Sequence, residues 1–178
     1  MATLNIQASI YFKINPNNNL MQRAIRSGLR RTVKGLRQDT SRKLRERYTV
    51  QQRRMAGTLK ISANGLTAKM ESTGEPISLK FYKHSPRKRP KRRPANGVLA
   101  EVIRGQAHYL PGTFLTNSGG VLKRVGRSRL PVRGIGRASA PGALNSAPMS
   151  QFIMQRVNER LEKNISHEIN AALHGFFT

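Results

Sequence analysis

The first residues of the chain alternate between hydrophobic and polar side chains. From Thr3 to Ile14, the even positions carry Leu, Ile, Ala and Phe, and the odd positions carry Thr, Asn, Gln, Ser, Tyr and Lys. A period of two is typical of a strand that buries one face. Pro16 and the asparagines at 17–19 end the alternation and favour the start of a helix. We therefore expect a strand over Thr3–Ile14.

The period changes to that of a helix in the next segment. Seven positions step by three or four residues: Met21, Ile25, Leu29, Val33, Leu36, Thr40 and Leu44. This stripe predicts one long helix over about residues 20–47, with basic side chains on its other faces. Gly28 and Gly35 each weaken a helix by about 1 kcal/mol relative to Ala, which indicates close packing or a bend.

The end of the chain has a second helical stripe. Its members recur every four residues: Ile153, Val157, Leu161, Ile165, Ile169 and Leu173. We expect a helix over about residues 150–174, with Ser150 as its N-cap.

The middle of the chain contains short apolar segments separated by turn residues. We expect strands over residues 59–62, 66–71, 77–82, 98–104 and 109–116. Ala63-Asn64-Gly65 is a suitable hairpin connection, because Asn and Gly tolerate positive φ. Residues 117–148 are rich in Gly, Ser, Pro and Arg and show little periodicity, so we expect a long irregular segment there.

Together these segments predict an α+β fold. The chain of 178 residues is long enough for a single domain, which we expect over residues 1–178. The N-terminal strand is expected to join an antiparallel sheet with the segments after Leu59. The two long helices are expected to pack on that sheet, with long basic and Gly/Pro-rich loops between the elements.

The net charge of the chain is the strongest indication of what the protein binds. The chain has 33 Lys and Arg against 8 Asp and Glu, a net charge of +25. Such an excess repels itself unless it meets a polyanion. Residues 23–60 contain 13 basic residues and two acids, and residues 80–93 contain eight basic residues and no acid. Nucleic acid or an acidic protein surface is the expected partner.

The basic arm, residues 84–96, is the most concentrated of these charges. Prolines at 86, 90 and 94 exclude a helix and a central strand, and favour an extended segment. Ten side chains are expected to face DNA or an acidic partner: Arg87, Lys88, Arg89, Lys91, Arg92, Arg93, Arg30, Arg31, Lys34 and Arg37. Because nothing in the sequence specifies a helix that reads bases, a DNA contact would be to backbone phosphates. A solubilising loop is the alternative.

Candidate catalytic groups are few. The four histidines, at 84, 108, 167 and 174, lack the spacing of metal ligands, and the chain has no Cys. Glu71 and Glu75 could form a metal pair, but carboxylates at turns and strand ends are common. We expect no enzymatic activity, no cofactor and no metal. The apolar runs are too short for a membrane span, and residues 1–14 lack the features of a signal peptide.

The second half of the chain resembles the bacteriophage minor tail protein Z family. The resemblance rests on Tyr109-Leu-Pro-Gly-Thr-Phe-Leu115, Val121-Leu-Lys-Arg-Val125, Leu130-Pro-Val-Arg133, Ser139-Ala-Pro141 and the closing helix, in that order. The first half agrees in layout, with a basic helix followed by Tyr48-Thr-Val-Gln-Gln-Arg53 and Leu59-Lys-Ile61. The match covers most of residues 20–173. Two features depart from the family: Arg137-Ala138 stand where it tends to have Gly-Pro, and the basic arm is unusually basic.

The resemblance implies a structural virion protein that completes the head-proximal end of a phage tail and joins it to the head. Its partners would be other tail and neck proteins, and double-stranded DNA in the tail channel. It would form a homo-oligomeric ring, assembled in the host cytoplasm. Six residues would make assembly contacts: Leu110, Pro111, Phe114, Leu130, Pro131 and Arg133. The alternative is a sequence-independent nucleic-acid-binding protein of ribosomal or nucleoid type.

Overall fold

The computed structural model describes residues 2–7 and 19–175 and has an α+β architecture, as the sequence predicts. Contacts divide the chain into two compact units. Unit 1 comprises residues 1–42, 58–73 and 141–178, and unit 2 comprises residues 43–57 and 74–140. A single domain was expected from the sequence.

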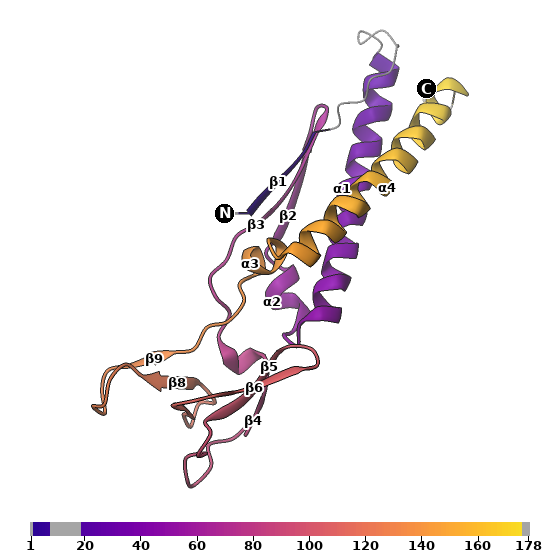
Figure 1. Ribbon diagram of the computed structural model, residues 1–178. Coiled ribbons are helices and arrows are strands. Elements are labelled where there is room, and N and C mark those ends of the chain that lie inside the picture. Colours follow the sequence, from indigo (N-terminus) through magenta and orange to yellow (C-terminus); the bar gives the residue numbers. More distant parts are fainter. Residues whose placement is uncertain (1, 8–18, 176–178) are drawn as a thin grey trace. The chain divides into compact units, whose positions relative to one another are not determined.

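Unit 1 contains a three-stranded antiparallel sheet and the two long helices (Figure 1). Its strands are β1 (Ala2–Gln7), β2 (Leu59–Asn64) and β3 (Thr67–Ser72), in the order β1-β3-β2. The N-terminal strand therefore pairs with the segments after Leu59, as expected, with Leu4 opposite Met70. Residues 8–14 of the expected strand lie outside the described residues. Gly65, with φ +58°, turns the chain between β2 and β3.

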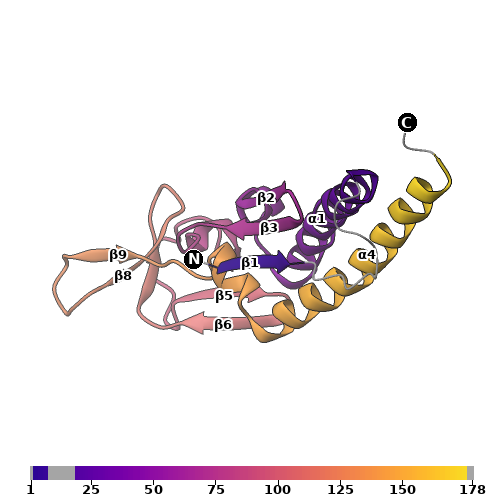
Figure 2. The ribbon, with the colours of Figure 1, turned by 90° about the horizontal axis from the view of Figure 1, so that it is seen from above.

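Helix α1 (Asn19–Arg47) and helix α4 (Ala147–Leu173) confirm the two predicted helices. The predicted stripe of α1 is buried, with Leu29 and Leu36 fully inaccessible and Ile25 half-buried. Figures 1 and 2 show α1 beside the sheet and α4 along α1. Met21, Ala24, Ile165 and Ile169 form a buried cluster between the two helices.

The start of α4 differs from the prediction. Its N-cap is Ser146 rather than Ser150, and Pro148 lies in the first turn, where the missing amide N–H costs no hydrogen bond. A short helix, α3 (Ala140–Leu144), precedes it. Along α4, Ile153, Val157, Ile165 and Ile169 are buried as expected, but Leu161 is half-buried and Leu173 is 68% exposed.

Unit 2 contains two further three-stranded antiparallel sheets, so the strands after Leu59 are divided among three sheets rather than joined in one. The first sheet has the order β4-β5-β6, with β4 (Lys83–Ser85), β5 (Val98–Ile103) and β6 (Gln106–Leu110). The second has the order β7-β8-β9, with β7 (Thr113–Leu115), β8 (Val121–Arg124) and β9 (Val132–Gly134). A short helix, α2 (Gln52–Ala56), completes the unit.

Two strand predictions and the prediction of an irregular segment are corrected. Residues 77–82 form the 3₁₀ turn η1 (Leu79–Phe81) instead of a strand, because Leu79 and Tyr82, three residues apart, are both buried. The expected strand over 109–116 is divided between β6 and β7 at Gly112, which has φ +79°. The segment 117–148 is not irregular throughout, since it contains β8, β9 and α3.

Candidate nucleic-acid and partner interface

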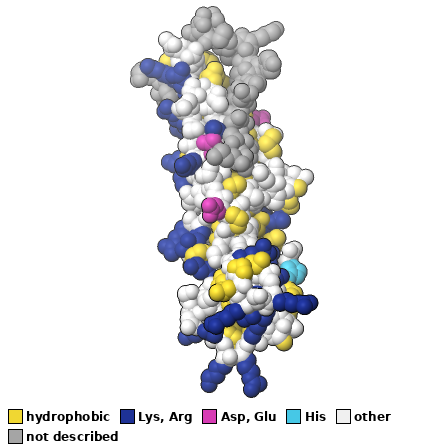
Figure 3. All heavy atoms as spheres, turned by 90° about the vertical axis from the view of Figure 1, so that its left-hand side faces the viewer, with side chains coloured by type: hydrophobic (Ala, Val, Ile, Leu, Met, Phe, Trp, Pro, Cys, Tyr) yellow, Lys and Arg dark blue, Asp and Glu magenta, His cyan; other side chains and the backbone are white. Residues whose placement is uncertain are grey.

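Positive charge is concentrated in unit 2. Its residues include 20 Lys and Arg and three acids, whereas unit 1 has 13 Lys and Arg and five acids. One of the three acids, Glu101, is already neutralised, because its Oε2 lies 2.6 Å from Lys83 Nζ. The hydrogen bond from Lys83 and a second one from the Gly105 amide lower the pKa of Glu101. On the face drawn in Figure 3, dark blue side chains far exceed magenta ones, and many lie beside yellow hydrophobic ones.

The basic arm is held at both ends by unit 2. We expected an extended loop over the whole arm, but its first two residues form the end of β4. His84 lies opposite Ala100 of β5 and is buried, with Nδ1 2.9 Å from the Tyr82 carbonyl oxygen. At the other end, the Gly97 amide donates to the Pro94 carbonyl at 3.0 Å. The first end is therefore positioned by strand pairing, and the second by a turn that leads directly into β5.

The middle of the basic arm lies along the second sheet. Arg89 Nη1 donates to Asn117 Oδ1 at 3.0 Å, and arm residues share a pocket of about 360 Å³ with the sheet. We call this pocket the arm groove. It is lined by Arg89, Pro90, Lys91, Arg93, Pro94, Phe114, Leu115, Leu122, Arg124, Arg129, Leu130 and Val132. The lining has five cations and no acid.

Strand pairing explains which side chains face the arm groove. Phe114 lies opposite Leu122 in the register of β7 and β8, and Arg124 lies opposite Val132 in that of β8 and β9. Paired residues share a face, and so do residues two apart on one strand. One face of the sheet therefore presents these four side chains to the groove.

The other face of the same sheet carries a second pocket of about 560 Å³. Thr113, Lys123 and Arg133 are cross-strand partners on this face. Pro76, Leu110, Pro111 and Arg137 complete the wall. The six expected assembly residues are thus divided between opposite faces: Phe114 and Leu130 line the arm groove, Leu110, Pro111 and Arg133 line the second pocket, and Pro131 lies exposed in the β8–β9 turn.

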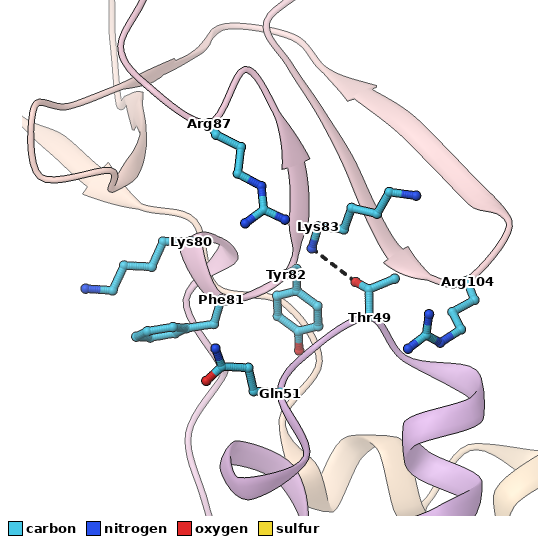
Figure 4. A pocket seen from close by; sticks show the side chains of 8 residues that line it. All are labelled: Thr49, Gln51, Lys80, Phe81, Tyr82, Lys83, Arg87 and Arg104. Carbon is cyan, nitrogen blue, oxygen red and sulfur yellow. Dashed lines mark hydrogen bonds between the residues drawn. The ribbon is translucent and has the colours of Figure 1, made fainter.

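A third pocket, the cation pocket, has a volume of about 270 Å³ and is drawn in Figure 4. Four cations line it together with polar and aromatic groups: Lys80, Lys83, Arg87, Arg104, Thr49, Gln51, Phe81 and Tyr82. Its frame is rigid, because the Lys83 amide donates to Thr49 Oγ1 at 3.2 Å and Arg104 Nε donates to the Arg45 carbonyl at 3.0 Å. Figure 4 shows Arg87 reaching into the pocket from the loop after β4, toward Tyr82.

Both aromatic side chains of the cation pocket, Phe81 and Tyr82, already make contacts with other residues of the chain. Arg54 lies over the Phe81 ring, with its guanidinium carbon 3.5 Å from the ring centroid, and Lys80 Nζ lies 4.9 Å from that centroid. Tyr82 is 2% exposed and its hydroxyl donates to the Ala138 carbonyl at 2.7 Å. Burial, with a smaller effect of Tyr48, raises the pKa of Tyr82 to about 12, so the ring stays neutral. The pocket therefore suits an anion rather than a stacked base.

The four candidate cations of α1 belong to unit 1. Arg30, Arg31, Lys34 and Arg37 are all exposed. Arg31 is partly neutralised, because its Nε lies 2.8 Å from Oε1 of the buried Glu168, although the two groups are not aligned for a hydrogen bond. These cations follow one helix and line none of the three pockets described in unit 2.

Sequence reasoning missed several residues that line the pockets. Leu122, Arg124, Arg129 and Val132 lie in the segment that was expected to be irregular. One feature of the sequence could have predicted these strands: two short stretches of apolar and basic residues lie on either side of a turn at residues 125–131. Strands of three or four residues are too short for a period to be recognised.

The described part of the chain contains neither a cluster of metal-binding side chains nor a helix that could span a membrane. Over residues 2–7 and 19–175, no three Asp, Glu or His side chains come together as a metal site would require. The helices described are all too short or too polar to cross a bilayer. Comparisons of this chain with models of protein families, with curated protein sequences and with solved structures found no match.

Proposed function

We propose that the protein is a structural virion component that completes the head-proximal end of a phage tail, joins it to the head and contacts DNA phosphates in the tail channel. The observation that carries the proposal is the order of motifs from Tyr109 to Pro141, which resembles that of the minor tail protein Z family. The high positive charge of unit 2 supports the DNA contact, since a tail channel is filled with DNA.

Three of these motifs lie in unit 2, on both faces of its second sheet. The three motif segments at 109–115, 121–125 and 130–133 contribute to β6, β7, β8 and β9. The residues that depart from the family pattern are also well positioned. Arg137 donates its amide to the Ile77 carbonyl at 2.9 Å, and the Ala138 carbonyl accepts from Tyr82. This turn is therefore held by one backbone hydrogen bond and one from the Tyr82 side chain, without Gly-Pro.

The cation pocket supports contact with phosphates rather than bases. Arg87 makes no hydrogen bond or ion pair to another described residue, so its donors are free for an anion. The cations on the pocket wall provide a sequence-independent site for a backbone phosphate. In the proposed setting the partners are DNA and neighbouring tail and neck proteins. Copies of the chain would form a ring at the head-proximal end of the tail.

Two measurements test this proposal. Deleting the gene from the phage that encodes it should leave separate heads and tails in electron micrographs, and expression of the protein from a plasmid should restore joined particles. The purified protein should also bind duplex DNA without sequence preference, with an affinity that falls steeply as salt rises. Normal particles from the deleted phage would overturn the assembly role, and a salt-independent affinity would overturn the phosphate contact.

The alternative function, a general nucleic-acid-binding protein of ribosomal or nucleoid type, is favoured by composition alone, namely the net charge of +25. The deletion experiment separates the two functions. A tail component is needed only for particle assembly and should be found in purified virions. A nucleoid or ribosomal protein should instead be found with host DNA or ribosomes.

A further inference from the structure

The arm groove differs chemically from the cation pocket. Its floor is apolar, formed by Phe114, Leu122 and Val132 of the sheet, with Leu130 at the edge. Its walls carry the five cations Arg89, Lys91, Arg93, Arg124 and Arg129. Leu130 is 69% exposed, so a large apolar side chain stands in water beside a ring of positive charge.

Duplex DNA does not account for this combination. A phosphate backbone is bound by cations and backbone amides and gains nothing from an apolar floor. Single strands are bound by stacking their bases on aromatic rings, and the arm groove has one ring, the half-buried Phe114.

We infer that the arm groove binds an extended segment of a partner protein in which acidic side chains alternate with apolar ones. The apolar side chains would cover Leu122, Leu130 and Val132, and the acidic ones would pair with Lys91, Arg93 and Arg129. An apolar centre with a charged rim is the usual composition of a protein interface. Charge complementarity selects an acidic partner, since the rim has no acid of its own.

This inference rests on the proposed function in one respect, because it takes the protein to be part of an assembly. It assigns DNA phosphates and the partner protein to two different pockets. The cation pocket takes phosphate, whereas the arm groove takes protein. It also gives a role to Phe114 and Leu130, which the resemblance only placed among assembly contacts.

The test uses the full-length protein and a labelled peptide. The probe is a fluorescein-labelled heptapeptide in which aspartates alternate with leucine and phenylalanine. One control peptide has serine in place of the apolar residues, and another has asparagine in place of the aspartates. Fluorescence anisotropy should show the probe binding at least about tenfold more tightly than either control, a difference of about 1.4 kcal/mol. Equal binding of the probe and the serine peptide would overturn the inference.

Matched variants locate the binding. Leu130→Ser should weaken binding of the probe about tenfold and leave the affinity for the serine peptide unchanged. Val125→Ser is the control, because Val125 is 61% exposed in the same β8–β9 turn but does not line the groove, and it should have no effect. Circular dichroism should show that both variants fold. An unchanged affinity in Leu130→Ser, or an equal loss in Val125→Ser, would overturn the assignment.

Binding of duplex DNA distinguishes this inference from the proposed function. Leu130→Ser should bind DNA as the parent does, because it removes no charge. If DNA binds and the probe does not, the groove inference alone fails. If the probe binds and DNA does not, the proposed phosphate contact fails while the groove inference stands.

Discussion

Gly28 allows the two long helices to approach each other closely. A Cβ atom at this position would lie 2.9 Å from Ile165 Cγ1 and 3.1 Å from the Ile165 Cα on α4. Both contacts are tighter than ordinary van der Waals contact, and the second is to backbone, which cannot rotate away. The residue therefore contributes to helix packing by having no side chain.

Gly28→Ala should destabilise the protein, although Ala favours a helix by about 1 kcal/mol relative to Gly. The added methyl group overpacks the helix contact, a change that costs about 1–3 kcal/mol. Denaturant unfolding should show a net loss, whereas the neighbouring Ser27→Ala should be neutral or slightly stabilising. A more stable Gly28→Ala variant would show that α4 is free to move away from α1.

At the scale of elements, the contact between α1 and α4 uses a second face of α1 in addition to the start of its apolar stripe. Gly28, Thr32, Gly35 and Asp39 follow one another at helical spacing. Asn164 Nδ2 donates to Thr32 Oγ1 at 3.0 Å, and Arg160 Nε donates to Asp39 Oδ2 at 2.7 Å. Gly35 leaves room for the Arg160 guanidinium, which a Cβ would meet. The helices are therefore joined by small and polar groups as well as by apolar ones.

The Asp39–Arg160 pair should make stability depend on pH. The hydrogen bond from Arg160 holds the pKa of Asp39 below its ordinary value of 3.8, against the opposing effect of burial. A carboxyl group whose pKa is lower in the folded state contributes its full stability above the ordinary pKa and loses it as pH falls below that value. Asp39→Asn should therefore lower the melting temperature at pH 7, and the difference from the parent should shrink below about pH 4.

The effect is expected to be modest, about 1 kcal/mol or less, because Arg160 is partly exposed. Glu159→Gln is the matched control. Its partner Arg156 lies on the same helix, and both side chains are more exposed, so its effect at pH 7 should be smaller. A difference between Asp39→Asn and the parent that persists at pH 2 would contradict the assigned cause.

At the scale of the whole molecule, charge is distributed unequally between the two units. Unit 2 has an excess of 17 positive charges and unit 1 an excess of eight. The phosphate contacts are therefore expected mainly in unit 2, where cations from separate segments surround pockets. The exposed cations of α1 extend along one helix, and Arg31 already has a carboxylate partner.

Neutralising equal numbers of charges in the two units tests this expectation. Replacing Lys80, Arg87, Lys88 and Arg92 by Gln should reduce the slope of log affinity against log salt by up to about 3.6, near 0.9 for each phosphate that is no longer bound. The same replacement of Arg26, Arg30, Lys34 and Arg37 should reduce it much less. Filter binding to duplex DNA measures both slopes. An equal or larger reduction in the α1 variant would place the DNA contact in unit 1.

Local pattern predicted the long elements because each carries its own signal. The stripe from Met21 to Leu44 predicted α1, the stripe from Ile153 to Ile169 predicted α4, and the two-residue alternation predicted β1. A long helix or strand must bury one face, so its period is recorded in its own residues. The positive charge and the density of cations in the basic arm were likewise available from composition.

Tertiary structure alone decided which of these residues lie together. The face formed by Gly28, Thr32, Gly35 and Asp39 has no apolar period; the two glycines indicated close packing or a bend, and the structure shows that α4 packs there. The turn at Leu79–Phe81 replaces an expected strand because Leu79 and Tyr82 are both buried there. The arm groove joins the basic arm to β7, β8 and β9, strands of three or four residues that are too short to carry a recognisable period. The sequence by itself determined the long elements and the charge, and the contacts between separate segments determined the short elements and the pockets.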